Sequence, residues 1–416
     1  IEHPGYYTFI PVLATCLIVL FPSSGSVSYK LLANPLLVFV GLISYSLYLW
    51  HQPIFSFLRM KSVGNPGESL FAVAIISTFI AAYLNYKFVE TPFRNKTKYT
   101  RKFIFSTSSA GLILCFFIGL LGHVYDGLDS RYKYLKSYSD SIQHSPKRDA
   151  CLSSQQTYIS PIDSCVYFEG HVSWATFGDS HTVEPAFALA QRLKEKGIAL
   201  RDLSFAGCPP ALNYELKGNE LCTKWIKETL TYLEQNKQIK NVLVGFRYSA
   251  YIFGSNIKSF PEIPNQVVLN TAGDHGYTDQ EKLDIYWLDL KEVIERLLDA
   301  DKKVLLLEPI PELPLHIGRG VTAFSIYGKS TLLDLTTSTS KEYYMQRHQF
   351  ILEKLRTLKE RNNLELVNVY DLLCHERGCP AVIEDSAIYF DDDHLSIVGS
   401  EILIERLSRQ SIDIFQ

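Results

Sequence analysis

The pattern of hydrophobic and polar positions divides the chain into two parts. Up to about residue 124, long aliphatic and aromatic runs are separated by short charged stretches, whereas later residues carry charge at the density of an ordinary soluble domain. Four of the early runs are apolar enough to cross a membrane, although the first is short for a span. These predicted spans cover residues 7–22, 36–58, 69–89 and 103–122.

The charged residues between the third and fourth predicted spans set the expected orientation. They form a basic cluster made of Arg94, Lys96, Lys98, Arg101 and Lys102. The positive-inside rule places such a cluster in the cytoplasm. The fourth span would then carry everything after Asp126 to the other side of the membrane, into an oxidising compartment.

Six cysteines of the later part become informative in such a compartment, because disulfides persist there. Their spacing along the chain predicts three pairs of neighbours: Cys151 with Cys165, Cys208 with Cys222, and Cys374 with Cys379. The alternative is a set of buried free thiols, since cysteine is often buried without pairing. The remaining two, Cys16 and Cys115, lie in predicted spans.

Beyond Cys165, short apolar runs alternate with longer runs whose apolar residues recur at three- and four-residue spacing. The predicted strands are 173–177, 199–205, 241–246, 303–307 and 364–369, and the predicted helices are 183–196, 219–236, 280–300, 341–362 and 396–409. This alternation indicates an α/β/α sandwich with a parallel sheet covered on both faces. Residues 250–280 have no clear period and are predicted to be loop.

Residues 125–149 are polar and rich in tyrosine, and we interpret them as a segment that connects the two parts. They could form a flexible linker or an ordered extension packed on the next domain. The tyrosines favour partial order, because disordered segments are usually poor in aromatic residues.

Ligands of a parallel sheet bind at the carboxyl ends of its strands. Ser180 follows the first predicted strand, Gly207 the second, Arg247 the third and Glu308 the fourth. We therefore expect these residues along one edge of the sheet.

Ser180 is a candidate nucleophile, and a serine hydroxyl needs a base whose tautomer is fixed by a carboxylate. The stretch "YFDDDHLSIVGS", residues 389–400, offers His394 three residues after Asp391, just before the last predicted helix. Each signal is weak alone, because a Ser or Asp before a helix is commonly an N-cap. His181 is adjacent to Ser180, but on the helix entry its side chain should point away from it.

In combination, these residues resemble the SGNH (GDSL-like) hydrolase family over about residues 170–416. "GDSH" matches the first family block, Gly207 of "SFAGCPP" the second, and "DDDH" the last. The resemblance implies that Ser180 is the nucleophile, His394 the base and Asp391 the residue that orients it. It also implies that the backbone N–H groups of Ser180 and Gly207 stabilise an oxyanion.

The third family block departs from the pattern. The family carries an asparagine oxyanion donor there, whereas this chain reads "VGFRYSAY" with Arg247 and Tyr248, and Asn256 comes too late to fit the strand end. Three alternatives stay open: two backbone donors suffice, Arg247 supplies charge or binds substrate, or Arg247 is structural and pairs with a carboxylate such as Asp179.

The apolar part has a resemblance of its own, over about residues 1–95. "GLISYSLYLWHQPIF" (41–55) followed by "YKFVETPFR" (86–94) is similar to the last spans of the acyltransferase-3 membrane family. That family's catalytic histidine lies in early helices that this chain does not contain, and we interpret the chain, which begins at Ile1, as the C-terminal part of a longer protein. We prefer a structural role for the two ionisable residues of these spans, His51 and Glu90.

Together the resemblances imply three segments: membrane helices (1–124), a periplasmic linking extension (125–168) and an SGNH domain (169–416). They imply a multi-pass protein of the bacterial inner membrane with its C-terminal domain in the periplasm. The implied activity is O-acyl transfer, most simply O-acetyl transfer, through an acyl-serine to a surface glycan such as lipopolysaccharide O-antigen. A membrane-tethered carbohydrate esterase or deacetylase and a non-catalytic glycan-binding domain are the alternatives.

The expected partners are the glycan acceptor and the lipid bilayer, and no nucleic acid. The net charge of −3 provides no basic field for nucleic acid. We expect no metal and no cofactor bound by this region, with acetyl-CoA as the acyl donor to the membrane portion.

Overall fold

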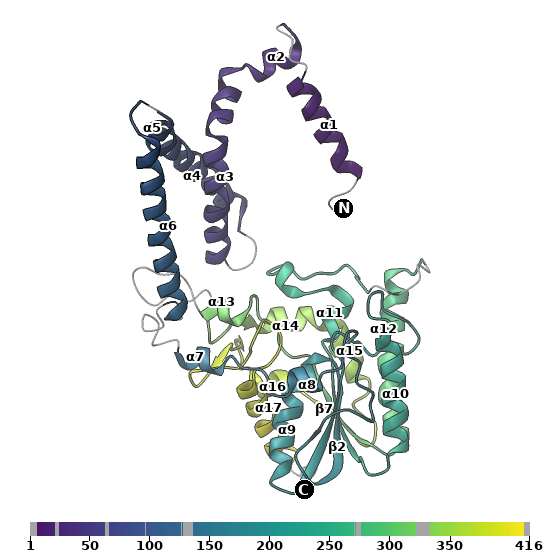
Figure 1. The fold of residues 1–416 in the computed structure, drawn as a ribbon. Helices are drawn as coiled ribbons and strands as arrows, with labels where there is room; N and C mark the ends of the chain where they lie inside the picture. Colours follow the sequence, from purple (N-terminus) through teal and green to yellow (C-terminus); the bar gives the residue numbers. More distant parts are fainter. Residues whose placement is uncertain are drawn as a thin grey trace. The chain divides into compact units, whose positions relative to one another are not determined.

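The computed structural model describes residues 6–20, 25–62, 66–95, 97–125, 127, 136–269, 271, 276–321 and 333–411. The chain forms two compact units, one made of Ile1–Met60 with Pro66–Asp129 and the other of Lys61–Asn65 with Ser130–Gln416. The first unit is helical, and the second is an α/β domain (Figure 1).

Among its described residues, the helical unit contains three helical stretches long and apolar enough to cross a membrane, namely Pro35–Lys61, Glu68–Arg94 and Arg101–Val124. The last three predicted spans match these stretches, and the first corresponds to the shorter apolar helix α1 (Tyr6–Leu20). Helix α1 has 15 residues and contains Pro11, and such a helix is roughly 22 Å long, less than the hydrocarbon core of a bilayer. Residues 21 and 22 of that predicted span lie outside the described residues. The helices are α1 (Tyr6–Leu20), α2 (Val27–Leu32), α3 (Pro35–Lys61), α4 (Glu68–Asn85), the π-helical η1 (Tyr86–Glu90), α5 (Thr91–Arg94) and α6 (Arg101–Val124).

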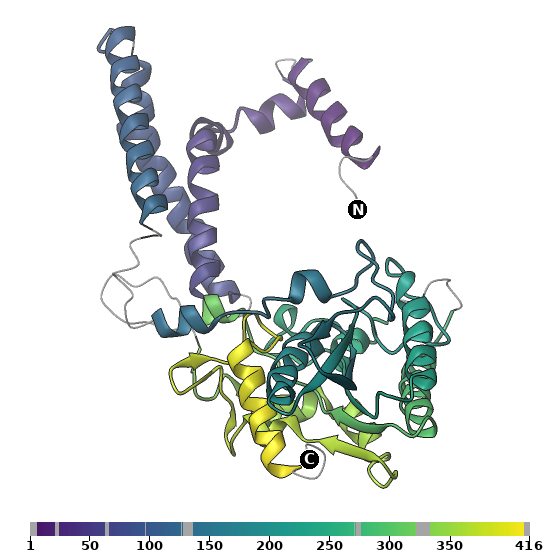
Figure 2. The same ribbon diagram turned by 60° about the horizontal axis from the view of Figure 1, so that its bottom comes forward.

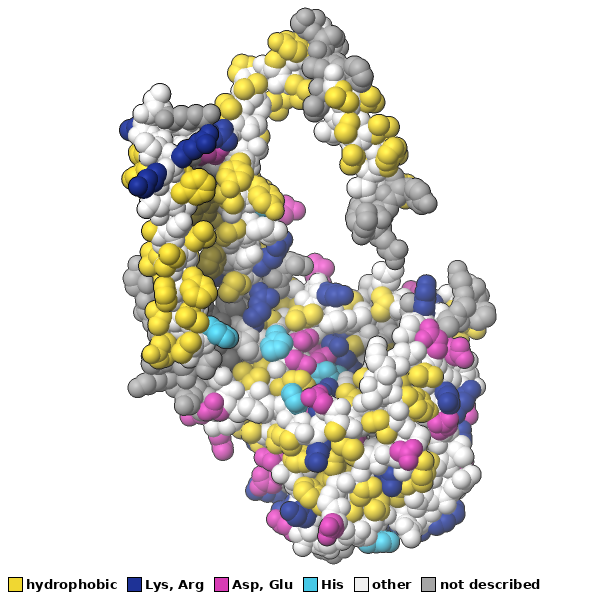
Figure 3. Space-filling view, in the orientation of Figure 1, with side chains coloured by type: hydrophobic (Ala, Val, Ile, Leu, Met, Phe, Trp, Pro, Cys, Tyr) yellow, Lys and Arg dark blue, Asp and Glu magenta, His cyan; other side chains and the backbone are white. Residues whose placement is uncertain are grey.

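Apolar side chains cover the outside of this unit, and Lys and Arg side chains gather near α5 (Figure 3). Lys96 of the basic cluster lies outside the described residues. The Glu90 carboxylate accepts a hydrogen bond from Ser46 (3.1 Å) and pairs with Arg94 (2.6 Å). His51 contacts the carbonyl of Tyr48 in its own helix (2.7 Å). Both ionisable residues therefore have partners within the unit, as their structural interpretation requires.

The α/β unit is built on a six-stranded sheet with the order β1-β3-β2-β4-β5-β7. The five predicted strands are confirmed, and all of them pair in parallel. The sequence did not reveal β1, which has two residues and pairs antiparallel with β3 at the edge. The strands are β1 (Val166–Tyr167), β2 (His171–Gly178), β3 (Ile198–Ser204), β4 (Asn241–Gly245), β5 (Lys303–Leu307) and β7 (Leu364–Val367).

Helices cover both faces of the sheet (Figures 1 and 2). One face packs on α10, α12 and α15, and the other on α9, α16 and α17. Their bounds are α9 (Val183–Lys194), α10 (Leu221–Gln235), α12 (Asp279–Asp299), α15 (Gln349–Arg356), α16 (Val369–Leu373) and α17 (Ile397–Gln410). Shorter elements are α13 (Ile317–Val321), α14 (Lys341–Arg347), β6 (Thr339–Ser340), β8 (Gly378–Cys379), β9 (Val382–Ile383) and β10 (Ser386–Ala387).

Two of the predicted elements are wrong in detail. The helix expected over 341–362 is interrupted at His348, a buried residue whose ring contacts the Ser249 hydroxyl at 2.8 Å, and α15 ends at Arg356. The loop expected over 250–280 contains part of α11 (Tyr248–Phe253) and the 3-10 turn η4 (Asn256–Lys258).

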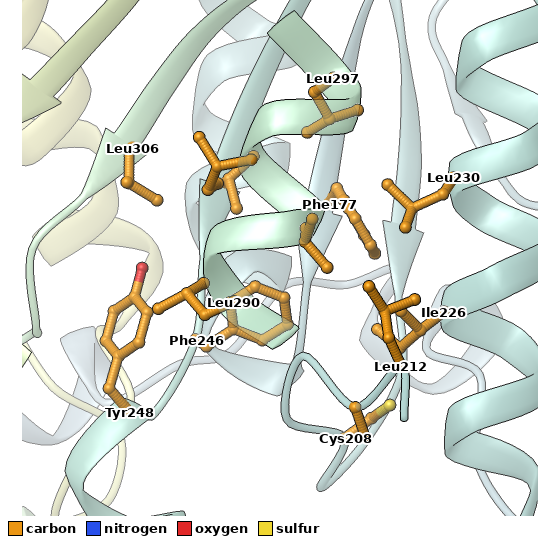
Figure 4. Packing of buried hydrophobic residues seen from close by; sticks show 14 of the residues in the cluster. Phe177, Cys208, Leu212, Ile226, Leu230, Phe246, Tyr248, Leu290, Leu297 and Leu306 are labelled. Atoms are coloured by element: carbon orange, nitrogen blue, oxygen red, sulfur yellow. The ribbon is translucent and has the colours of Figure 1, made fainter. Parts of the chain in front are cut away.

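The core between the sheet and α10 and α12 is aromatic at its centre. Phe177 of β2 packs against Trp225 of α10 and against Phe246 beyond β4, with ring centroids 5.9 and 6.0 Å apart. Leu290 of α12 and Tyr248 lie in the same buried cluster (Figure 4). This packing fixes the carboxyl ends of β2 and β4, where the candidate site begins.

Residues 136–149 of the connecting segment are ordered and pack within the α/β unit. Helix α7 (Lys136–Ser141) contacts β10, where the hydroxyl of Ser141 accepts a hydrogen bond from the N–H of Ala387 (2.7 Å). The carbonyl of Gln143 accepts one from the N–H of Ile397 at the start of α17 (3.0 Å). Residues 128–135 of the segment, with Tyr132 and Tyr134, lie outside the described residues.

The three predicted disulfides are confirmed. Sulfur–sulfur bonds join Cys151 to Cys165, Cys208 to Cys222 and Cys374 to Cys379. They close loops of 14, 14 and 5 residues, and such loops stabilise a fold mainly by restricting the unfolded chain.

Candidate active site

The turn after β2 is organised by Asp179, not by Ser180. Asp179 caps the 3-10 turn η3 (Ser180–Thr182), and one of its carboxylate oxygens accepts a hydrogen bond from the N–H of His181 (2.8 Å). The other oxygen accepts from the N–H of Arg247 (2.7 Å) and from the hydroxyl of Tyr251 (2.7 Å). Burial opposes the charge of this carboxylate, but His181 and these hydrogen bonds outweigh it and lower the pKa of Asp179. The cap is thus provided by Asp179, and the hydroxyl of Ser180 is left for other contacts.

Ser180, His394 and Asp391 form a continuous hydrogen-bonded series, although the serine and the histidine are 214 residues apart in sequence. The serine Oγ lies 2.8 Å from Nε2 of His394, and Nδ1 of that ring lies 2.7 Å from Oδ2 of Asp391. The other carboxylate oxygen of Asp391 accepts from the N–H groups of Asp393 (2.9 Å) and His394 (2.7 Å). The carboxylate therefore fixes both the backbone and the ring of the histidine.

The ring of His394 is held between two other rings. Phe390 stacks on one side, with centroids 5.3 Å apart and planes 18° apart, and the ring of His181 lies 4.2 Å away. It is His394, rather than the adjacent His181, that contacts the serine hydroxyl. The buried ring of His181 lies near Asp179 (3.4 Å) and Asp393 (3.8 Å).

The charges around His394 favour its protonated form. Burial alone would lower its pKa, but the carboxylates of Asp391 and Asp393 outweigh burial and raise the pKa of His394 to about 10. The same contacts overcome burial at Asp391 and hold its pKa well below the usual range. Burial and the neighbouring carboxylates raise the pKa of Asp392 to about 6.

Gly207 lies in the turn after β3 with a positive φ of 63°, a conformation that glycine adopts without strain. Its carbonyl accepts a hydrogen bond from the side chain of Asn219 (2.9 Å), and the adjacent Cys208 is tied to Cys222. In the part of the chain that the structure describes, the backbone N–H groups of Ser180 and Gly207 donate to no acceptor. Both remain available to bind an oxyanion.

Arg247 lies at the carboxyl end of β4, and its guanidinium faces acidic partners. It pairs with Glu312 (3.2 Å) and with Asp393, whereas Asp179 contacts only its backbone N–H. The guanidinium thus pairs with carboxylates, as one of the alternatives expected, but with Glu312 and Asp393 and not with Asp179. The side chain of Asn256 is buried and donates to the carbonyl of Leu313 (2.8 Å), in keeping with its exclusion from the third block.

Glu308 follows β5 as predicted, but it is Glu312, four residues further on, that contacts the site. Glu312 is buried between Arg247 and Arg347, and its carboxylate lies 2.9 Å from the latter. Burial would raise its pKa, but the two guanidinium groups outweigh burial and lower the pKa of Glu312 to about 2. Sequence reasoning missed this residue, because the loop after β5 carries no periodic signal.

Arg148, in the short helix α8 (Arg148–Cys151), is another residue that the sequence did not reveal. Its guanidinium pairs with the buried Glu184 (2.6 Å), donates to the carbonyl of Ser180 (3.3 Å) and lies 5.0 Å from the ring of Phe390. It therefore touches the turn that holds the serine and the ring that stacks on His394.

Replacing Arg148 by methionine is expected to lower the free energy of unfolding by about 3 kcal/mol, because Glu184 would stay buried without its partner. Urea unfolding of the detergent-solubilised chain, followed by the fluorescence of the buried Trp174 and Trp225, measures the change. The double variant R148M/E184Q should recover part of the loss. A single variant as stable as the wild type would contradict the prediction.

The imidazole and carboxylate groups of this loop are close enough to one another to hold a cation on distance alone. Some of these groups already have partners, whereas the two ring nitrogens of His181 have no hydrogen-bond partner among the described residues. Nδ1 of His394 contacts two carboxylates, and Asp393 pairs with Arg247. The absence of a bound metal or cofactor stays a prediction.

Comparison with known families identifies the domain that carries these residues. The model of a family described as "SGNH domain (fused to AT3 domains)" matches residues 150–409. The chain belongs to this family. The matched region contains Ser180, Gly207, Asp391 and His394, and both of the sequence resemblances are consistent with the family's description.

Relatives of this SGNH-domain chain are known in Staphylococcus aureus. A protein of strain MRSA252, provisionally named as an O-acetyltransferase, is 29% identical over 181 residues, which are 41% of this chain and 28% of the relative. O-acetyltransferase OatA of strain NCTC 8325 / PS 47 is 34% identical over 97 residues, 23% of this chain and 16% of OatA. The chain thus spans less than a third of the length of either protein.

A solved structure of similar fold is the periplasmic domain of a lipopolysaccharide acetyltransferase from Salmonella ser. Paratyphi A. The two are 17% identical with a TM-score of 0.46, and the match covers 69% of this chain and 99% of that domain.

Proposed function

We propose that this chain performs the final transfer step of an O-acyltransferase, most simply an O-acetyltransferase, that acts on a cell-surface glycan. The observation that carries the proposal is the series Ser180–His394–Asp391, formed in a domain whose family is fused to membrane acyltransferase domains. The O-acetyltransferase names of the Staphylococcus relatives support the choice of acyl transfer.

In the first half-reaction, the Oγ of Ser180 attacks the carbonyl carbon of the acyl donor while its proton passes to Nε2 of His394. Asp391 keeps Nδ1 protonated and stabilises the imidazolium. The negative oxygen of the tetrahedral intermediate is placed at the N–H groups of Ser180 and Gly207. Its collapse breaks the bond to the leaving group, which takes the proton from Nε2, and leaves an acyl-serine.

In the second half-reaction, a hydroxyl of the glycan attacks the acyl-serine carbonyl carbon. His394 takes the hydroxyl proton and returns it to Oγ of Ser180 as the ester bond to the serine breaks. The products are the acylated glycan and free Ser180. Water in place of the glycan would give hydrolysis by the same steps, so access of the acceptor decides the outcome.

The helical unit provides the setting for this reaction. Its three apolar stretches support attachment to a lipid bilayer, and the basic residues near α5 support a cytoplasmic location for that end. The three disulfides support an oxidising location for the catalytic domain, which we place in the periplasm of a bacterium with the helices in its inner membrane. Acetyl-CoA in the cytoplasm is the proposed source of the acyl group.

The test is a transfer assay with the purified chain, using 4-nitrophenyl acetate as donor and lipopolysaccharide with an unacetylated O-antigen as acceptor. Mass spectrometry is expected to find an acetyl group on the peptide that contains Ser180 and on the glycan. Release of acetate without glycan acetylation would overturn transfer and favour the esterase alternative. A chain that is never acetylated at Ser180 would favour a non-catalytic, glycan-binding domain.

A further inference from the structure

The histidine of the proposed site has two carboxylate partners. Nδ1 of His394 lies 2.7 Å from Asp391 and 2.8 Å from Oδ1 of Asp393. The first contact belongs to the proposed triad, whereas the second has no place in the mechanism described above. The side chain of Asp393 is 4% exposed, so its charge is held away from bulk water.

Asp393 has a cationic partner on its other side. Its Oδ2 forms an ion pair with the guanidinium of Arg247, which is also paired with Glu312. Glu312 is in turn fixed by Arg347, whose guanidinium donates to the carbonyl of Gly254 (2.6 Å). Arg247 therefore reaches Asp393 from an anchored position. Burial would lower the pKa of Arg247, but the carboxylates of Asp393 and Glu312 outweigh burial and raise that pKa further above the usual range.

We propose that Asp393 is a positioning residue that shares the Nδ1 proton of His394 with Asp391, and that Arg247 acts through Asp393 by neutralising its charge. The inference rests on the proposed function in one respect, the activation of Ser180 by His394. It assigns Arg247 to the base side of the reaction, and the oxyanion is left to the two backbone N–H groups.

The protonation state of His394 at working pH decides whether this residue can act as the base. The base must be neutral to accept the proton of Ser180, and two unscreened carboxylates at Nδ1 would hold it protonated. The cation of Arg247 offsets part of the charge of Asp393, so that the second carboxylate orients the ring while raising the pKa of His394 less than an unpaired carboxylate would. The pKa of His394 is still raised to about 10, so the rate of labelling is expected to rise on the alkaline side of neutrality. The titratable and charged groups that face His394 or its carboxylates are Asp391, Asp392 and Asp393 on its own loop, Ser180 and His181 on the turn after β2, and Arg247 after β4.

The test measures the rate at which a fluorophosphonate labels Ser180 in the full chain, as a function of pH. Removal of the negative charge in D393N should lower the pKa of His394 and move the rise of the labelling rate to lower pH by about one unit or more. R247Q leaves Asp393 unpaired and should move the rise to higher pH by about one unit. In D393N/R247Q the two shifts should largely cancel.

Two matched variants separate this role from a merely structural one. R247K keeps the positive charge, and D392N removes a neighbouring carboxylate for which the structure shows no contact with His394. In both variants, the rise of the labelling rate should stay within about half a pH unit of that of the wild type. An oxyanion or substrate role for Arg247 would instead make R247Q slower at every pH without moving the rise, and this result would overturn the inference.

The same assay distinguishes this inference from the proposed function. If D393N and R247Q did not shift the pH profile of labelling while the chain still transferred acetyl to the glycan, only the inference would be overturned. Opposite shifts in a chain that only hydrolyses the donor would support the inference and overturn glycan transfer. A wild-type Ser180 that no fluorophosphonate labels at any pH would overturn both.

Discussion

Replacement of Ser180 by alanine is expected to lower glycan acetylation at least about a thousandfold, to the background of the assay, because the proposed acyl intermediate forms on the Oγ that this variant lacks. His394 and Asp391 would remain in place, since their mutual hydrogen bonds do not involve the serine. The expected result is therefore a folded, inactive protein. The measurement is the amount of O-acetyl groups on the glycan of cells that make the variant in place of the wild type.

The matched control for this variant is Ser139→Ala. Ser139 is an exposed serine of α7, in the same unit as Ser180 and outside the hydrogen-bonded series. The Ser139→Ala variant should leave glycan acetylation unchanged. If S180A retained more than a tenth of the wild-type acetylation, the assigned role of Ser180 would be contradicted.

Replacement of Gly178 by alanine is expected to lower the free energy of unfolding by more than about 3 kcal/mol, because the added methyl has no room. A Cβ at this position would lie 1.9 Å from the carbonyl oxygen of Gly245 and 2.7 Å from the side chain of Thr182. The two glycines face each other at the carboxyl ends of β2 and β4. Strand separation there would also strain the hydrogen bond from the N–H of Arg247 to Asp179.

The measurement is the denaturant midpoint of the purified variant, with resistance to trypsin as a second reading. Gly318→Ala is the matched control, since a Cβ there would meet only the side chain of His316, at 3.4 Å. If G178A unfolded within about 1 kcal/mol of the wild type, the close approach of β2 and β4 would not be required.

Much of the fold was predictable because its signals are local. The apolar runs that form β2, β3, β4, β5 and β7 and the helical periods between them lie within short windows, and the cysteine pairs join near neighbours in sequence. The errors in the predicted secondary structure occurred where tertiary contacts outweigh the local sequence pattern. His348 interrupts a periodic helix while its ring contacts Ser249, which is 99 residues away.

The residues of the site also fall into those that the sequence could predict and those that it could not. Ser180, Asp391 and His394 could be named in advance because they lie in short blocks of a known family, and the structure brings them together. The partners of Arg247 could not be named in advance, because the choice between Asp179, Asp393 and Glu312 depends on where three separate loops end. Nothing in the sequence distinguishes these three acids.

The long sequence separation between Ser180 and His394 has a consequence for the timing of activity. The serine follows β2 early in the domain, whereas its base precedes the last helix, so the two meet only after the intervening parallel strands have assembled. Until then the hydroxyl is no more reactive than that of any free serine. On the proposed mechanism, a newly made chain would therefore not be acylated before its fold is complete.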